Sequence, residues 1–396
     1  MDALMLPLNW QRVRLGDIAH IFDGTHQTPQ YTHYGVAFFS VENIVSDKPS
    51  KFISQQDYLT ATNQNRPEYN DILLTRIGTI GVSKVVTWNY PFSIYVTLAV
   101  IKQSKYFNSY YLHYFIQSNF FQKELKNNSL LQAIPCKINM NELKKCEVIL
   151  PPLNEQAAIT NILSDVDRYL YSLDALILKK ESVKKALSFE LLSQRKRLKG
   201  FNQNWQKVRL VDICEFGNGG AYETLIVENG DFKLISLNSI DIDGNLKNTM
   251  KRVNFYDNSL KQDDIVMVLS DVAHGDFLGL CAVIPNNDYV LNQRMGRLRK
   301  KNDCINILFL RLYINANQKY FKMQGQGSSQ LNLSKKAIEY FEILLPPLNE
   351  QAAIANVLSG LDNEIISLKN KKRQFENVKK ALNHDLMSAK IRVLNK

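Results

Sequence analysis

The chain has 396 residues, 45% of them apolar and 22% charged, which fits a globular protein of two or three domains. No stretch approaches the roughly 18 to 20 consecutive apolar residues of a membrane span, and the start lacks a basic segment followed by an apolar one, so we expect a cytoplasmic protein with no membrane partner. The net charge of +11 favours a polyanionic partner, and the five scattered cysteines indicate neither a disulfide framework nor a zinc knuckle.

The first elements in chain order are an opening segment, WQRVRLGDI from Trp10, and two apolar runs with strand-like spacing, FFSVENI from Phe38 and DILLTRIG from Asp71. Polar, glycine-containing segments lie around them at 23–30, 76–84 and 132–137. Glycine lets backbone amides approach phosphates, and Arg, Lys, Asn and Gln match base edges, although each segment could also be an ordinary surface turn. The candidate DNA-contacting residues here are Thr25, His26, Gln27, Arg76, Thr79, Lys84 and Lys137.

An aromatic run, YYLHYFIQSNFFQ at 110–122, follows at helical spacing, and LFLRLYINANQKYF from Leu308 is similar. Because the run occurs twice, we expect it to form a core helix in each half rather than a platform on which bases stack.

The segment LPPLNEQAAI at 150–159 then introduces a long predicted helix. The two prolines exclude helix at that point, and Asn154 can cap a helix that starts at Glu155. Some 40 residues of helix would measure about 60 Å, longer than a small domain's core, so we expect it to pack on a second long helix. Apolar residues recur with steps of four and three at Ile159, Leu163, Val166, Leu170, Leu173, Ile177, Val183, Leu187 and Leu191.

The sequence then repeats itself at an offset of 195 residues. WQKVRLVDI from Trp205 matches the opening, LPPLNEQAAI from Leu345 is identical to the copy at Leu150, and Asn349 can again cap a helix from Glu350. The second apolar seam comprises Ile354, Leu358, Leu361, Ile365, Leu368, Phe375, Val378, Leu382 and Leu386. Four glycine-containing or polar segments of the second half, at 217–222, 270–276, 292–297 and 325–330, are predicted to be loops. The candidate DNA-contacting residues in them are Asn218, Gly219, Tyr222, Ser270, His274, Gln293, Arg294, Gln326, Ser328 and Gln330.

This organisation predicts an α+β protein with two homologous α/β domains, related by a pseudo-twofold axis and separated by two long antiparallel coiled-coil helices. The helices must run antiparallel because the first leads from one variable domain to the next and the second can return. The predicted parts are a recognition domain at 1–150, a spacer helix at 151–199, a second recognition domain at 200–345 and a second spacer helix at 346–396.

The duplicated LPPLNEQAAI, the W-x-x-V-x-L-x-D-I openings and the DILLTRIG run together resemble the DNA-specificity subunits of type I restriction-modification systems. The second copy departs from the last motif, with Val268, Leu269, Ser270 and Asp271 in place of Thr75 to Gly78. The resemblance implies a non-catalytic subunit in which each domain reads half of a split duplex target. The helices would set the gap between the halves and dock two methyltransferase subunits, and restriction (translocase) subunits would join through the assembled complex.

The same resemblance places S-adenosylmethionine, ATP and magnesium on partner subunits and no cofactor in this chain. The sequence contains no GxxxxGK[ST] phosphate loop, no Asn-Pro-Pro-aromatic tetrapeptide and no H-E-x-x-H, so we predict no catalytic and no metal site. Three alternative functions fit the sequence less well. A two-headed protein-binding adaptor fits the basic charge less well, a fused enzyme would need catalytic motifs, and an RNA binder would be expected to show an RRM-like motif.

Overall fold

The computed structural model describes residues 6–44, 48–49, 51–272 and 275–393. The chain divides into two compact units: unit 1 comprises residues 1–175 and 370–396, and unit 2 comprises residues 176–369. The helix α6 (Leu153–Leu192) begins in unit 1 and ends in unit 2, whereas α11 (Leu348–Met387) begins in unit 2 and ends in unit 1. Each unit thus holds half of each long helix.

Unit 1 contains two four-stranded sheets. The first sheet is antiparallel throughout, and in the second only β4 and β8 run parallel. The first has the order β2 (Ile21–Asp23), β9 (Leu98–Ile101), β6 (Ile72–Thr75), β7 (Ser83–Val85), and the second β3 (Tyr31–Thr32), β5 (Lys51–Ile53), β4 (Val36–Phe39), β8 (Phe92–Ile94). Two ribbons pair β1 (Gln11–Arg14) with β12 (Glu147–Leu150) and β10 (Ser129–Leu130) with β11 (Lys137–Ile138). The shorter helices are α1 (Leu15–Ile18), α2 (Gln55–Ala61), α3 (Ser109–Ile116), α4 (Asn119–Asn127) and α5 (Met140–Lys145).

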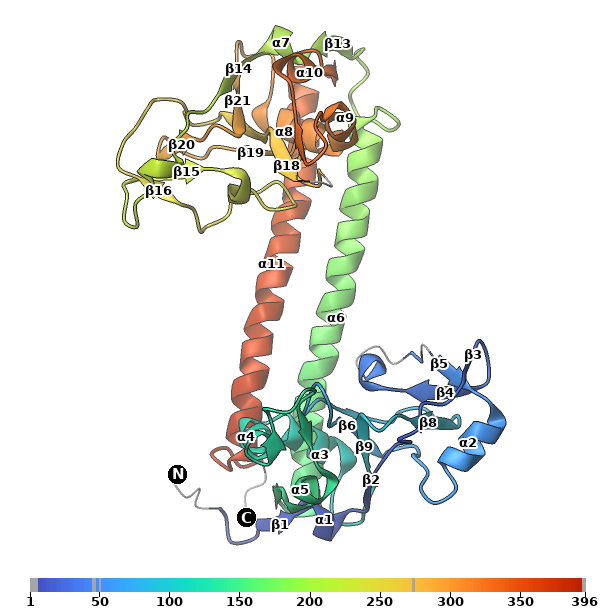
Figure 1. Ribbon diagram of the computed structural model, residues 1–396. Coiled ribbons are helices and arrows are strands. Elements are labelled where there is room, and N and C mark those ends of the chain that lie inside the picture. The colour runs from blue at the N-terminus through green and yellow to red at the C-terminus, as the bar shows by residue number, and fades with distance from the viewer. Residues whose placement is uncertain (1–5, 45–47, 50, 273–274, 394–396) are drawn as a thin grey trace. The chain divides into compact units, whose positions relative to one another are not determined.

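The first sheet of unit 1 is buried on both faces (Figure 1). Strand residues alternate between the faces, so Ile72 and Leu74 pack toward α3 while Leu73 packs toward the second sheet. The aromatic residues Tyr111 and Phe115 of α3 belong to the same core as Ile72, which confirms that the aromatic run lies in the core. The run forms two helices, α3 and α4, and not the single helix that was predicted.

Unit 2 repeats this arrangement. Its main sheet buries Ile265 and Met267 against the helices and Val266 and Val268 against the second sheet. The main sheet has the order β14 (Cys214–Asn218), β21 (Met295–Lys300), β17 (Ile265–Val268), β19 (Cys281–Val283), and the second β16 (Arg252–Val253), β15 (Phe232–Ile235), β20 (Tyr289–Leu291). The ribbons are β13 (Gln206–Arg209) with β23 (Glu342–Leu345) and β18 (Ser270–Val272) with β22 (Gln330–Asn332), and the short helices are α7 (Leu210–Ile213), α8 (Ile307–Ala316), α9 (Gln318–Gln324) and α10 (Lys335–Glu339).

The run FFSVENI and its counterpart in unit 2, LISLNSI from Leu234, are strands only in their first residues. β4 ends at Phe39, and a 3-10 turn (Val41–Asn43) follows because the backbone amide of Ser40 donates to Asn43 Oδ1 at 3.2 Å. In unit 2 the amide of Ser236 donates to Ser239 Oγ at 2.9 Å in the same way. These short polar side chains offer the backbone an alternative to the sheet.

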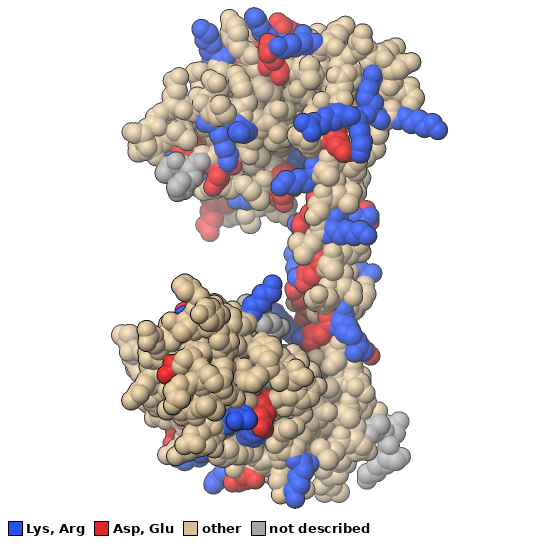
Figure 2. Space-filling view, turned by 90° about the vertical axis from the view of Figure 1, so that its right-hand side faces the viewer, with Lys and Arg blue, Asp and Glu red and all other residues tan. Residues whose placement is uncertain are grey.

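In each unit the two helix halves run antiparallel, as predicted. Ion pairs join Asp167 to Lys379 and Asp174 to Lys372 in unit 1, so positions rise along α6 as they fall along α11. In unit 2 the pairs are Lys180–Glu364, Glu181–Lys369 and Lys184–Asp362. Figure 2 shows side chains of both signs interspersed along these helices. Ion pairs this exposed add little stability, so their main role is to fix how α6 and α11 are aligned along their length.

Two details of the helix prediction are wrong. The helices begin at Leu153 and Leu348, one residue before the predicted cap residues Asn154 and Asn349. In α6 this is because the amides of Glu155 and Gln156 already donate to Pro152 O at 2.9 Å. Asn154 and Asn349 therefore lie in the first turn and not at the N-cap position, and Asn349 Oδ1 accepts from the amide of Glu350 at 2.9 Å. Within the apolar seam, Val183 and Val378 are 40% and 51% exposed and face away from the core.

Candidate nucleic-acid interface

Three sequence segments that were predicted separately meet at one place in unit 1. The guanidinium of Arg76 donates to Asp23 Oδ2 at 2.9 Å, which links the segments 23–30 and 76–84. The amide of Gly78 donates to Cys136 O at 2.8 Å, and Cys136 Sγ donates to Gly78 O at 2.7 Å, which adds the segment 132–137. We call these three segments loop cluster 1.

Arg76 itself lies inside unit 1, not on the surface. Its side chain is 6% exposed, and besides Asp23 it donates to the backbone oxygens of Val96 and Ile138 at 3.0 and 3.2 Å. Burial lowers the pKa of Arg76, and the neighbouring Asp23 acts in the opposite direction. All of these partners belong to unit 1, so Arg76 is a residue that positions loop cluster 1 and is not available to read a base.

The other candidates of loop cluster 1 lie at its surface. His26, Gln27 and Thr79 are exposed, and Thr25, Lys84 and Lys137 are half-buried. His26 Nε2 lies 3.2 Å from Asp23 Oδ2, so the carboxylate that holds Arg76 also orients the imidazole. The role of Asp23 was not predicted, because its partner Arg76 is 53 residues away in the sequence.

The four segments predicted in unit 2 also converge. The amide of Gly219 donates to Met295 O at 3.3 Å, and Val272 on β18 pairs with Gln330 on β22. The two pairs of segments are joined because the amide of Leu269, which precedes β18, donates to Arg294 O at 3.1 Å. We call the segments 217–222, 270–272, 275–276, 292–297 and 325–330 loop cluster 2. Asn218, Gln293, Arg294, Gln326 and Ser328 are exposed there, and Gly219, Tyr222 and Gln330 are half-buried. His274 lies outside the described residues.

Three candidates of loop cluster 2 make contacts that stabilise the fold of unit 2. Ser270 is buried and donates to Asn332 Oδ1 at 2.6 Å. Tyr222 donates its hydroxyl to Asp257 at 2.9 Å, a bond that raises the pKa of the phenol. Gly219 leaves no room for a side chain, since a Cβ there would lie 2.2 Å from Asn292 O, and Gly24 in unit 1 is equally crowded by Ile94 O at 2.1 Å.

The two clusters have corresponding backbone hydrogen bonds but different side chains. The amide of Arg76 donates to Thr97 O and its carbonyl accepts from Ile138, and in unit 2 Leu269 makes the corresponding bonds to Arg294 and Leu333. An arginine that is tied to a carboxylate in unit 1 is thus replaced by a buried leucine in unit 2. Such divergence on a retained scaffold is typical of recognition surfaces.

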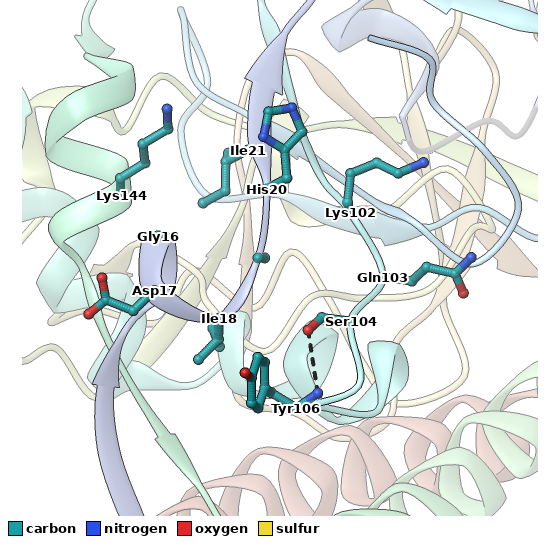
Figure 3. A pocket seen from close by; sticks show the side chains of 11 residues that line it. Gly16, Asp17, Ile18, His20, Ile21, Lys102, Gln103, Ser104, Tyr106 and Lys144 are labelled. Carbon is teal, nitrogen blue, oxygen red and sulfur yellow. Dashed lines mark hydrogen bonds between the residues drawn. The ribbon is translucent and has the colours of Figure 1, made fainter.

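A pocket of about 420 Å³ lies elsewhere in unit 1, and none of the predicted residues lines it (Figure 3). Its walls come from residues 16–21 of the opening motif, from 102–104 and 106 after β9, and from Lys144. Two of its polar side chains have partners within unit 1: the ammonium of Lys102 binds Glu68 and Asp71, and His20 Nε2 lies 2.7 Å from Asn65 Oδ1. We assign it no ligand.

Comparison with known proteins identifies the family. A model of the type I restriction modification DNA specificity domain matches residues 7–180 and again 202–377. The chain is 26% identical to the type I restriction enzyme MjaVIII specificity subunit of Methanocaldococcus jannaschii, over 100% of this chain and 96% of that protein. It is 24% identical to the putative MjaX specificity subunit of the same organism, over 98% and 95%. The solved S subunit of a type I restriction-modification system from M. genitalium has the same fold, with a TM-score of 0.62 at 17% identity over 96% of this chain and 98% of that one.

The two family matches span most of the chain, so the chain belongs to the family of type I restriction modification DNA specificity domains. It is a specificity subunit of a type I restriction-modification system, the component that recognises DNA and is not itself catalytic. None of the described helices is long and apolar enough to cross a membrane.

Proposed function

We propose that each unit reads one half of a split duplex DNA target through its loop cluster. The observation that carries this proposal is that separately predicted polar segments meet at one place in each unit. Corresponding backbone hydrogen bonds, those of Arg76 and Leu269, hold the segments in both units. Exposed amide and guanidinium groups such as Gln27, Gln293 and Arg294 are the donors and acceptors that reading base edges requires. The net charge of +11 favours the phosphate contacts that hold such a reader on DNA.

In this proposal residues 1–150 and 200–345 are the two target-recognition domains, and the helical segments 151–199 and 346–396 set the gap between the half-sites. Two methyltransferase subunits dock, one on each repeated half, and restriction subunits join through the assembled complex. S-adenosylmethionine, ATP and magnesium are held by those partners, and the complex methylates one adenine in each half-site in the cytoplasm.

The identical LPPLNEQAAI segments support a partner that binds twice. Glu155, Gln156 and Ile159 are buried and serve the fold, whereas Leu153 and its counterpart Leu348 are 52% and 47% exposed. Retaining an exposed leucine in both copies is not required by packing within the units. A partner surface that meets each copy in turn would account for it.

The test is to express the chain with the methyltransferase encoded beside it and to map methylated bases across the host genome. We expect a two-part motif with a fixed gap and one methylated base in each part, on opposite strands. Methylation that is continuous in sequence, or that is unchanged when this chain is omitted, would contradict the proposal.

A further inference from the structure

One side-chain pair lies at the same place at the edge of each loop cluster, with one member in the cluster and one beside it, and the two pairs differ in their chemistry. In unit 1 the residue after β8 is Tyr95, whose amide donates to Phe39 O at 2.9 Å and which forms a parallel bridge with Thr25. In unit 2 the residue after β20 is Asn292, whose amide donates to Ile235 O at 3.0 Å and which forms a parallel bridge with Gly220. Tyr95 and Asn292 are therefore equivalent.

The side chains of both residues bond to the residue three places after the bridge. In unit 1 the hydroxyls of Thr28 and Tyr95 lie 3.1 Å apart. In unit 2 the amide of Asn292 donates to Glu223 Oε1 at 2.8 Å. Thr28 and Glu223 are both exposed, so each pair presents one outward-facing polar group.

The pair in unit 2 is fixed in orientation and opens into a pocket. Asn292 is 2% exposed and its Oδ1 accepts from the amide of Tyr222 at 3.2 Å, so its Nδ2 must point to Glu223. A pocket of about 140 Å³ is lined by Glu223 and Asn292 together with Asn238, Lys251 and Arg294. Two cations thus flank a carboxylate that has one hydrogen bond among the described residues.

We propose that Glu223–Asn292 in unit 2 and Thr28–Tyr95 in unit 1 are specificity-determining pairs, each selecting a base in its own half-site. This inference rests on the proposed function. An ionised carboxylate only accepts hydrogen bonds and repels phosphates, so Glu223 selects a base with an amino group in the major groove, cytosine or adenine. The hydroxyls of Thr28 and Tyr95 can both donate and accept hydrogen bonds, so unit 1 selects a base by different hydrogen-bonding groups at the equivalent position.

The experiment uses the whole complex of this chain with its methyltransferase. In Glu223→Gln the amide can donate as well as accept, so we expect a roughly ten- to hundredfold shift in the relative methylation of sites that differ at one position of one half-site. The other half-site and the gap should not change. Glu228→Gln is the matched control, because Glu228 is an exposed carboxylate in the next turn of the same segment.

A second variant, Tyr95→Phe, tests unit 1 and removes only a hydroxyl from a ring packed near Phe38. This variant should alter one position in the half-site that unit 1 reads and leave the half-site of unit 2 unchanged. An unchanged motif in both variants, or an equal loss of methylation at all sites, overturns the assignment of these pairs. If the wild-type complex shows no two-part motif, the proposed function fails instead, and the two failures are thereby told apart.

Discussion

A buried glutamate in each unit connects the two most conspicuous repeated motifs. Glu155 accepts from Trp10 Nε1 at 3.0 Å and from Arg392 Nε at 2.7 Å, and Glu350 accepts from Trp205 Nε1 at 3.1 Å and from Arg197 Nε at 3.0 Å. The sequence predicts only that these glutamates suit a helix start. Their tryptophan partners lie 145 residues away, a distance over which no local pattern reports a contact.

Replacing Glu350 with Gln should destabilise unit 2 clearly more than the control below, because the fully buried carboxylate that pairs with Arg197 is lost. The control is Glu342→Gln, whose pair with Lys207 is more than half exposed on both sides and should cost under about 1 kcal/mol. Urea unfolding of both variants measures the difference. Equal midpoints would show that the buried carboxylate adds no stability.

His113 makes the stability of unit 1 depend on pH. Burial, with help from the nearby Lys379, lowers the pKa of this histidine to about 4. The amide of Gln117 donates to His113 Nε2 at 2.8 Å, which suits the neutral ring. Below about pH 6.5 the unfolded chain therefore binds a proton at His113, whereas the folded chain does not bind it until about pH 4. The free energy of unfolding of unit 1 therefore falls as the pH drops from about 6.5 toward 4. In His113→Gln this part of the pH dependence should disappear from thermal unfolding curves, and a slope as steep as that of the wild type would refute it.

The native cysteines offer a direct test of loop cluster 1. Burial raises the pKa of Cys146 and Cys214 to about 12 and also raises that of Cys281, so alkylation at neutral pH reports on Cys136 and Cys304. Target DNA should slow the alkylation of Cys136, which lies in loop cluster 1. Cys304 lies beside the start of α11 and outside loop cluster 2, so it serves as the control. Equal rates with and without DNA at Cys136 would place this cluster away from DNA.

At the scale of elements, periodicity predicts the two long helices well, and it predicts the short helices and the loops less well. The 40-residue helices and the buried strands β6 and β17 follow from apolar spacing alone. The segment at 270–276 was expected to be a loop, yet Ser270 to Val272 form a strand because they pair with Gln330 to Asn332. That partner lies about 60 residues further on, so nothing local distinguishes a paired segment from a free one.

The helix pair can be lengthened without disturbing its ion pairs. Because Asp174 binds Lys372, a heptad inserted after Leu173 lies opposite a heptad inserted after Lys372, and the five interhelical pairs are all kept. Seven residues add about 10 Å and nearly preserve the apolar phase, so the mapped gap should widen by about three base pairs. A four-residue insertion at the same points turns the seam by roughly 40 degrees and should abolish activity. An active heptad variant with an unchanged gap would show that the helices do not set it.

At the scale of the molecule, the repeat predicts that the two halves of the motif can be exchanged independently. Replacing residues 16–135 with the corresponding segment of a relative leaves the LPPLNEQAAI segment and both long helices intact. Methylated-base mapping should then show one new half-site beside one unchanged half-site and the original gap. A change in both halves would mean that the units do not read independently.

The division of the chain also has a consequence for its synthesis. Unit 2 is one continuous stretch, whereas unit 1 needs residues 370–396 to complete its core, where Leu386 and Met387 are fully buried and Arg392 reaches Glu155. During translation unit 2 can therefore finish folding while unit 1, although made first, still lacks its last helical turns. The half of the protein that leaves the ribosome first therefore completes its core only after unit 2 and the end of α11 have been made.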